Sequence, residues 1–343
     1  MKALRYLLFP FSIAYGLVVW LRNKCFDWGL FTSHVFSLPL IGIGNLSTGG
    51  TGKSVVVDYI LHHFQSKYRL ATLSRGYGRK TKGFRKAQEG DSPLTLGDEP
   101  YQFFQKYADV CVAVAEKRVT GVRGLLSESP RLHAIVLDDV FQHRWISPSL
   151  SILTTTYQAP YNTDRLLPVG NLREVRSGSQ RADIILVTKT PNDASPIQRQ
   201  QMIASLHLLP NQTAYCCKIA YSKRVTSQNE TLPWSVFKKN PFLLVTGIAN
   251  DAPLIQYFNV ENAKFEHLSF PDHFNYSSKA IKRIMETAKK CPILTTEKDF
   301  GRLKPLLPHT VSLYYIPIEM AFFSNKEETS FLSQIENILS QKN

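Results

Sequence analysis

Short apolar runs alternate with amphipathic stretches along most of the chain. The amphipathic stretches predict helices, among them residues 53–65, 116–126, 196–207, 277–289 and 327–339. The apolar runs predict β-strands at residues 38–43, 68–74, 110–115, 132–137, 150–154, 184–188, 213–219, 242–246, 293–296 and 311–316. Continuous apolar strands that alternate with helices are typical of a parallel sheet covered on both faces, so we expect an α/β fold.

An uncharged, mostly apolar segment lies near the N-terminus, at residues 6–21, with basic residues on both sides. A helix of this length is about 24 Å long, which is shorter than the roughly 30 Å hydrocarbon core of a bilayer. No small-residue cleavage site follows it, as a signal peptide would require. We expect a helix that lies at a membrane interface; the alternative is a helix packed against the rest of the protein.

The composition indicates a globular protein with anionic partners. Of the 343 residues, 43% are hydrophobic, which excludes a disordered, collagen-like or coiled-coil chain. Lys and Arg number 41 against 27 Asp and Glu, and the formal net charge of +14 favours phosphates, nucleic acid or an acidic membrane surface as partners. Five cysteines without a metal-type CxxC pair favour a reducing compartment.

A glycine-rich turn joins the first predicted strand to the first predicted helix. Glycines there let backbone N–H groups point at phosphates, and the helix N-terminus adds positive charge. In a P-loop the lysine reaches the terminal phosphates and the following hydroxyl binds Mg²⁺. The pattern is a variant, because Ser47 stands where GxxxxGK[ST] has its first Gly. The nucleotide-binding residues that we expect are Ser47, Thr48, Gly49, Gly50, Thr51, Gly52, Lys53 and Ser54.

Two carboxylates end the predicted strand at residues 132–137. In P-loop enzymes a carboxylate at the end of a neighbouring strand holds Mg²⁺ directly or through water. Asp138 or Asp139 is the candidate, and the two have different roles because side chains alternate along a strand. The alternative is an Asp that only caps the following turn.

An irregular stretch rich in Pro and Gly, at residues 158–179, predicts a domain boundary near residue 150. We expect a membrane-associating helix in residues 1–30 and a P-loop nucleotide-binding domain in residues 31–150. The remaining residues, 151–343, are expected to form a second α/β domain that closes over the active site.

Eight motifs in a fixed order resemble one known family. They are GNLSTGGTGKS (44–54), SRGYGR (74–79), GDEP (97–100), LDDVFQH (137–143), LLPVGNLRE (166–174), GIAN (247–250), FPDHF (270–274) and TEKD (296–299). In this order and spacing they resemble the tetraacyldisaccharide 4′-kinases, the lipid A 4′-kinases of Gram-negative bacteria, up to about residue 304. Val140 departs from the family's usual Gly, and Ser54 from the commoner Thr.

The resemblance implies an activity and a location. The γ-phosphoryl of ATP, with Mg²⁺, would pass to the 4′-hydroxyl of an acylated glucosamine disaccharide 1-phosphate. The product would be the 1,4′-bisphosphorylated lipid A precursor. The enzyme would then work at the lipid surface of the inner membrane, on its cytoplasmic face, as a peripheral or monotopic protein.

The resemblance also implies roles for single residues. Asp98 and His273 would act as a paired general base on the acceptor hydroxyl, from different domains. Taken alone, Asp98 could be a helix N-cap and His273 a structural histidine. Lys53 would act catalytically, and Glu174 would join Ser54, Asp138 and Asp139 on the metal side, although its polar loop equally suits a solvated carboxylate.

A run of six basic residues without an acid lies at residues 75–86. It is either a solvated loop or a site for the substrate 1-phosphate or lipid headgroups. The substrate candidates are Arg75, Tyr77, Arg118 and Arg173, with Tyr77 suited to pack on a sugar ring and Arg to bind phosphate. The segments at residues 188–189 and 296–299 follow apolar strands and either contact adenine or brace the site.

Two other functions share part of this evidence. A P-loop NTPase that couples hydrolysis to a partner would use Lys53, Ser54 and Asp138 but gives His273 no role. A nucleic-acid-dependent ATPase would suit the positive charge, but basic and aromatic residues are not interleaved in stripes. We therefore expect no nucleic-acid partner.

Overall fold

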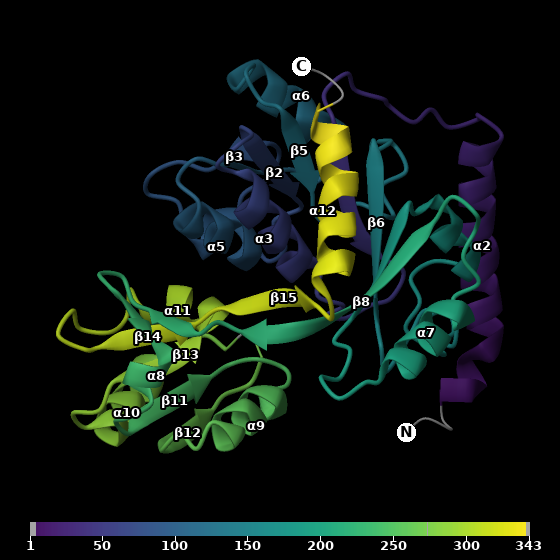
Figure 1. The fold of residues 1–343 in the computed structure, drawn as a ribbon. Helices are drawn as coiled ribbons and strands as arrows, with labels where there is room; N and C mark the ends of the chain where they lie inside the picture. Colours follow the sequence, from purple (N-terminus) through teal and green to yellow (C-terminus); the bar gives the residue numbers. More distant parts are fainter. Residues whose placement is uncertain (1–4, 273, 341–343) are drawn as a thin grey trace. The chain divides into compact units, whose positions relative to one another are not determined.

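The computed structural model describes residues 5–272 and 274–340 (Figure 1). The chain forms two compact units. The first comprises Met1–Ile219 and Met320–Asn343, and the second comprises Ala220–Glu319.

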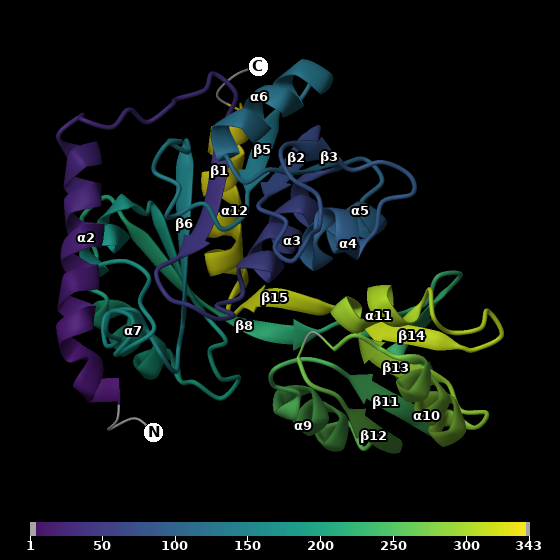
Figure 2. The same ribbon diagram turned by 180° about the vertical axis from the view of Figure 1, so that it is seen from behind.

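The first unit is built on a nine-stranded sheet in the order β15-β8-β7-β6-β1-β5-β2-β4-β3. Its strands are β1 (Leu40–Asn45), β2 (Leu70–Ser74), β3 (Arg85–Lys86), β4 (Cys111–Val114), β5 (Ala134–Leu137), β6 (Leu150–Thr156), β7 (Ile184–Thr188), β8 (Thr213–Tyr221) and β15 (Ile318–Phe322). The strands from β4 to β8 in this order are parallel, and β3 pairs with β4 in the antiparallel direction. β1 lies between β5 and β6, so the turn that follows it opens at the middle of the sheet's carboxyl edge (Figure 2).

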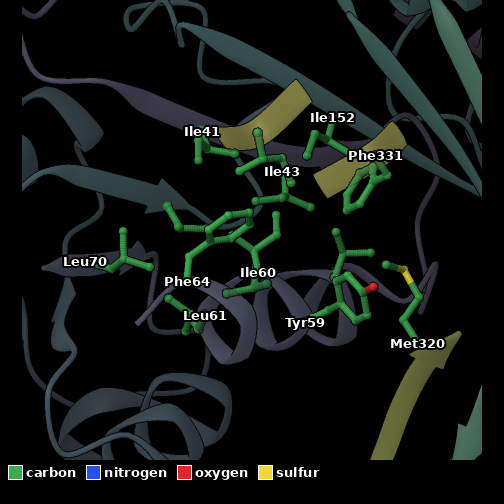
Figure 3. Packing of buried hydrophobic residues seen from close by; sticks show 14 of the residues in the cluster. Ile41, Ile43, Tyr59, Ile60, Leu61, Phe64, Leu70, Ile152, Met320 and Phe331 are labelled. Carbon is green, nitrogen blue, oxygen red and sulfur yellow. The ribbon is translucent and has the colours of Figure 1, made fainter. Parts of the chain in front are cut away.

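Helices cover both faces of this sheet. One face carries α3 (Lys53–Phe64), α5 (Asp98–Lys106) and α12 (Asn325–Ser340), and the other carries α6 (Arg118–Glu128) and α7 (Pro196–Ser205). On the first face Ile41 and Ile43 of β1 pack with Ile60 of α3 and Phe331 of α12 (Figure 3). Alternate residues of β1 face this cluster, and glycines fill the other face, where Gly44 closely approaches Phe141.

The remaining elements of this unit are short, apart from one long helix. They are η1 (Tyr6–Leu8), α2 (Phe9–Asp27), α4 (Pro93–Leu96) and η2 (Arg176–Arg181). Pro10 stands in the first turn of α2, where a missing N–H costs nothing. Gly16 lies against Leu166, where a Cβ atom would come within 2.7 Å of a methyl group.

The second unit has its own six-stranded sheet, in the order β10-β9-β14-β13-β11-β12. Its strands are β9 (Arg224–Thr226), β10 (Thr231–Pro233), β11 (Phe242–Thr246), β12 (Phe265–Ser269), β13 (Ile293–Thr296) and β14 (Leu313–Ile316). β12, β11, β13 and β14 are parallel. Its helices are α8 (Trp234–Phe237), α9 (Ala252–Val260), α10 (Ser278–Ala288) and α11 (Glu297–Leu303).

The predicted α/β fold is confirmed, and each predicted strand is present. The division of the chain, however, differs from the boundary predicted near residue 150. β6 pairs with β1 along five residues, and β7 and β8 continue the same sheet. The chain instead crosses between the units within β8 and returns within β15.

Candidate active site

The glycine-rich turn is held in shape by hydrogen bonds to its own strand and to β6. Gly49 and Gly52 adopt φ angles of 97° and 84°, which glycine alone adopts without strain. The Thr51 hydroxyl accepts a hydrogen bond from Asn45 Nδ2 at 2.9 Å and lies 2.8 Å from the Thr154 hydroxyl. Gly52 caps α3, so the first N–H groups of the helix face the turn.

Residues at the end of β7, together with Asn171, brace the same turn from outside. The Thr188 hydroxyl donates to the carbonyl oxygen of Thr51 at 2.8 Å, and Lys189 Nζ donates to that of Gly50 at 2.6 Å. The Thr48 N–H donates to the carbonyl oxygen of Asn171 at 2.7 Å. Of the two roles expected for residues 188–189, these contacts favour bracing.

Lys53 and Asp139 form an ion pair that Arg173 completes. Lys53 Nζ lies 3.4 Å from Asp139 Oδ1, and Arg173 donates to both carboxylate oxygens at 2.9 and 3.2 Å. Arg173 also donates to Asn45 Oδ1. Burial raises the pKa of Asp139, but the hydrogen bond from Arg173 and the charges of Lys53 and Arg173 outweigh it and lower the pKa to about 2.

Asp138 has a different environment from its neighbour. Its side chain is buried, and its Oδ1 atom has no hydrogen-bond partner among the described residues. Burial raises its pKa to about 7, and the charge of Glu99 adds to the effect. Arg118, which is also buried, donates to the backbone carbonyl oxygens of Ala115 and Asp138, at 2.7 and 2.8 Å. Arg118 therefore supports the turn that carries the acidic pair.

Glu99 is a member of the site to which sequence reasoning gave no role in the chemistry. It lies in the first turn of α5, and its Oε1 accepts a hydrogen bond from the Ser54 hydroxyl at 2.6 Å. Asp98 begins the same helix, after Gly97. The GDEP motif marked this segment, but only the fold brings Glu99 to Ser54.

Glu174 lies among protein donors rather than at the phosphate turn. The carboxylate is buried, and its Oε1 accepts from Arg181 at 2.6 Å and from Asn23 at 2.8 Å. Gln142 Nε2 lies 3.4 Å from Oε2. These contacts favour a structural role over the expected role as a metal ligand.

The basic run at residues 75–86 divides into two sets. Arg79, Arg85 and Lys86 are engaged by Glu116, Asp91 and Ser129 respectively. Arg75 is exposed, as are Lys80 and Lys82. Tyr77 is 87% exposed between two glycines with positive φ angles.

The motifs of the second unit meet at the carboxyl ends of its parallel strands. Asp299 is buried, and its Oδ2 accepts from the Gly247 N–H and from the Thr296 hydroxyl, both at 2.8 Å. These contacts hold residues 296–299 against Gly247 within the second unit. His273 lies outside the described residues.

The donor set beside Lys53 suits a magnesium ion. Mg²⁺ prefers a few carboxylate and hydroxyl oxygens together with phosphate oxygens and water, rather than an all-protein cage. No group of three or more His, Cys, Asp and Glu side chains able to hold a metal occurs in the described part of the chain. Asp138 offers a buried oxygen without a partner, and Ser54 and Glu99 offer a hydroxyl and a carboxylate 2.6 Å apart.

A strand, a glycine-rich turn with Lys and Ser, a helix, and an acidic pair on the neighbouring strand together define a P-loop nucleotide-binding protein. Comparisons with known proteins narrow this class. The model of the tetraacyldisaccharide-1-P 4′-kinase family matches residues 4–339, and the chain belongs to this family of kinases.

Relatives that align with nearly the full length of the chain carry the same family name. Proteins named tetraacyldisaccharide 4′-kinase from Flavobacterium johnsoniae and Phocaeicola vulgatus are 42% and 39% identical to it. The alignments cover 99% and 94% of this chain, and 99% and 92% of the relatives. A crystal structure of LpxK from Aquifex aeolicus in complex with ATP is similar, with a TM-score of 0.81, 28% identity and coverage of 98% of this chain and 99% of that one. The predicted family, fold class and kinase activity are confirmed.

Proposed function

We propose that this chain transfers the γ-phosphoryl of ATP to the 4′-hydroxyl of tetraacyldisaccharide 1-phosphate. The observation that carries the proposal is the environment of the phosphate turn. Lys53 is held 3.4 Å from Asp139, beside Ser54 and the unpartnered buried oxygen of Asp138. Family membership supplies the identity of the acceptor.

We assign the magnesium ligands to Ser54, Asp138 and Glu99. When bound there, the ion neutralises charge on the phosphates and orients them. Asp139 is already paired with Lys53 and Arg173, and its role is to hold these two cations in place. Glu174 is engaged by Arg181 and Asn23 and is left out of the ligand set.

The chain's own groups stabilise the charge of the transferred phosphoryl. We assign this role to the N–H groups of the turn and to the Lys53 ammonium, and the Thr188 and Thr154 contacts hold the turn in shape without a ligand. Asp98 and His273 form the base that accepts the acceptor's proton; this assignment rests on the family resemblance.

We assign the acceptor's 1-phosphate to the exposed part of the basic run, with Arg75 and the neighbouring Lys80 and Lys82. Tyr77 stands in the same loop with its ring exposed, which suits packing on a sugar. Arg118 and Arg173 leave the substrate set, because both are engaged at the acidic pair.

We assign attachment to the inner membrane to α2, because most of its large apolar side chains are exposed and several small or polar ones are buried. Ser12, Gly16 and Asn23 are buried against the protein, whereas Phe11, Leu17 and other large apolar side chains are exposed. Phe26 is also buried, but most large apolar side chains of the helix face outward, and such a face suits a lipid surface. In the described part of the chain no helix reaches the length and apolarity needed to cross a bilayer.

A transfer assay in detergent tests the activity, with labelled ATP and the acylated disaccharide monophosphate. We expect label in the lipid product, and a loss of roughly 100-fold or more in K53M, which removes the ammonium at the phosphates. The matched variant K282M, at an exposed position of α10, should keep wild-type activity. Label released only as inorganic phosphate, with or without the lipid, would instead favour an NTPase.

A further inference from the structure

The inner face of α2 contacts the segments that carry the candidate active site. The Tyr15 hydroxyl donates to the carbonyl oxygen of Arg173 at 2.8 Å, and Asn23 Nδ2 donates to Glu174 Oε1 at 2.8 Å. Arg22 donates to the carbonyl oxygen of Gln142 at 2.8 Å. Three polar side chains of one helix thus reach two loops more than a hundred residues away in sequence.

Both loops lead directly to the phosphate turn. The Arg173 guanidinium donates hydrogen bonds to Asp139 and Asn45, and Asp139 in turn forms an ion pair with Lys53. Gln142 Nε2 donates to the carbonyl oxygen of Asn45 at 2.7 Å. The hydrogen bond from Tyr15 therefore falls on the same residue whose guanidinium binds Asp139.

The loop that carries Arg173 is irregular, and contacts from other segments hold it in place. Residues 165–175 contain isolated bridges but no helix or regular strand, and the Arg173 N–H donates to the carbonyl oxygen of Leu46 at 2.7 Å. The buried Glu174 carboxylate requires partners, and Asn23 and Arg181 supply them. Tyr15 and Asn23 contact two consecutive residues, and together with Leu46 they hold the backbone from which the Arg173 side chain extends.

We propose that Tyr15 and Asn23 are positioning residues for phosphoryl transfer, acting through Arg173 and Asp139 on Lys53. The inference rests on the proposed kinase function and adds a second role to α2. The outer face of the helix meets lipid, while its inner face aligns the catalytic lysine.

Y15F tests the proposal, since it removes one hydroxyl and no packing volume. We expect kcat to fall by about 3- to 10-fold, with the KM for ATP within about twofold, because the bond that is lost orients a group rather than binding nucleotide. Y68F is the matched control: its hydroxyl lies 3.2 Å from Ser340, in α12, and its kcat should not change. Unchanged kcat in Y15F would overturn the proposal.

A double-mutant cycle separates positioning from general structural support. If Tyr15 acts through Arg173, Y15F should lower kcat in the wild type but not in an R173A background. Equal losses in both backgrounds would overturn the proposal. N23A serves as the second variant and should show the same dependence on Arg173.

Two measurements separate a loss of positioning from lost membrane contact and from unfolding as causes of a lower kcat. Y15F should bind vesicles of phosphatidylglycerol and phosphatidylcholine like wild type, so that a loss of kcat in detergent does not reflect lost membrane contact. Its Tm should match that of Y68F, and a kcat loss explained by unfolding would count against the proposal. If wild type and Y68F phosphorylate no lipid, the proposed function itself is refuted. That outcome differs from a double-mutant cycle in which Y15F lowers kcat equally in both backgrounds.

Discussion

Asp138 and Asp139 are adjacent and chemically identical, yet the fold gives them opposite properties. Asp138 continues β5 into the buried interior, where burial raises its pKa to about 7. Asp139 has a φ angle of 48°, which turns the chain so that its carboxylate meets Lys53 and Arg173. A single turn thus yields one carboxylate with an open oxygen and one that is fixed by cations.

The two carboxylates should have opposite effects on stability. The pKa of Asp138 is raised from 3.8 to about 7, so the folded protein holds its proton where the unfolded chain has lost it. Stability therefore falls as pH rises from about 4 to 7, by on the order of 4 kcal/mol at most. D138N removes this loss, so it should be more stable than wild type at pH 8, and the difference should vanish near pH 4.

D139N provides the contrast in the same turn. The pKa of Asp139 is lowered to about 2, so its stabilising contribution is present above about pH 4 and is lost only as pH falls through 2. D139N should accordingly be less stable than wild type at pH 8. Chemical denaturation of the nucleotide-free protein with a metal chelator, from pH 4 to 8, measures both. Equal shifts of the same sign in the two variants would contradict this account.

At this scale the sequence predicts the residues whose roles are local. Lys53, Ser54 and the glycines lie in one turn, so spacing alone identifies them. Arg118 looks the same in the sequence whether it is buried beneath Asp138 or exposed to a substrate, and only tertiary packing decides. Glu99 was missed for the same reason, because Ser54 is 45 residues away in the chain.

At the scale of elements, the end of β7 shapes the phosphate turn. T188V keeps the side-chain volume but removes the hydroxyl that donates to Thr51 at 2.8 Å. We expect ATP to bind about 3- to 10-fold more weakly, because the turn loses one hydrogen bond worth about 0.5–1.5 kcal/mol. T190V is the control, since the Thr190 hydroxyl donates to Val187 and not to the turn. Calorimetric titration with ATP decides, and equal affinities in the two variants would refute the bracing role.

The outer face of α2 is the surface to which we assign membrane contact. Val18 is 66% exposed on it, and a carboxylate there would have to enter the lipid interface. V18E should bind anionic vesicles at least about tenfold more weakly than wild type, because it loses an apolar contact and adds like charge. V260E adds the same charge at an apolar position outside α2 that is 73% exposed, and it should bind normally. Cosedimentation measures both, and wild-type binding by V18E would exclude α2 as the contact.

Continuously apolar strands were predictable because their run of hydrophobic residues is a strong signal. Ile184–Thr188, Phe242–Thr246 and Ile293–Thr296 begin and end where the sequence predicts. β3 has two residues and carries Arg85 and Lys86, so no apolar pattern marks it. Its strand geometry comes from pairing with β4 rather than from its own side chains.

The division of the whole molecule was not predictable from local pattern. β6, β7 and β8 have the same apolar character as the strands of the second unit, and the irregular stretch at residues 158–179 resembles a linker. That stretch is instead tied to the first unit, through Tyr15 to Arg173 and through Thr48 to Asn171. The chain returns to the first unit through β15, and no local sequence pattern indicates this return.

The base pair that we propose combines residues from distant parts of the chain, since Asp98 belongs to the first unit and residue 273 falls in the range of the second. Neither residue is part of the phosphate turn, so D98A and H273A should leave ATP binding within about threefold of wild type. Each should lower kcat by roughly 100-fold or more, as expected when a general base is lost. Since the two act as one unit, the double variant should be no slower than the slower single variant.

D109A and H309A change the same residue types at exposed positions of the two ranges and should keep normal turnover. Rapid-mixing measurements of lipid phosphorylation and ATP titrations give both quantities, and multiplied losses in the double variant would mean that the residues act separately.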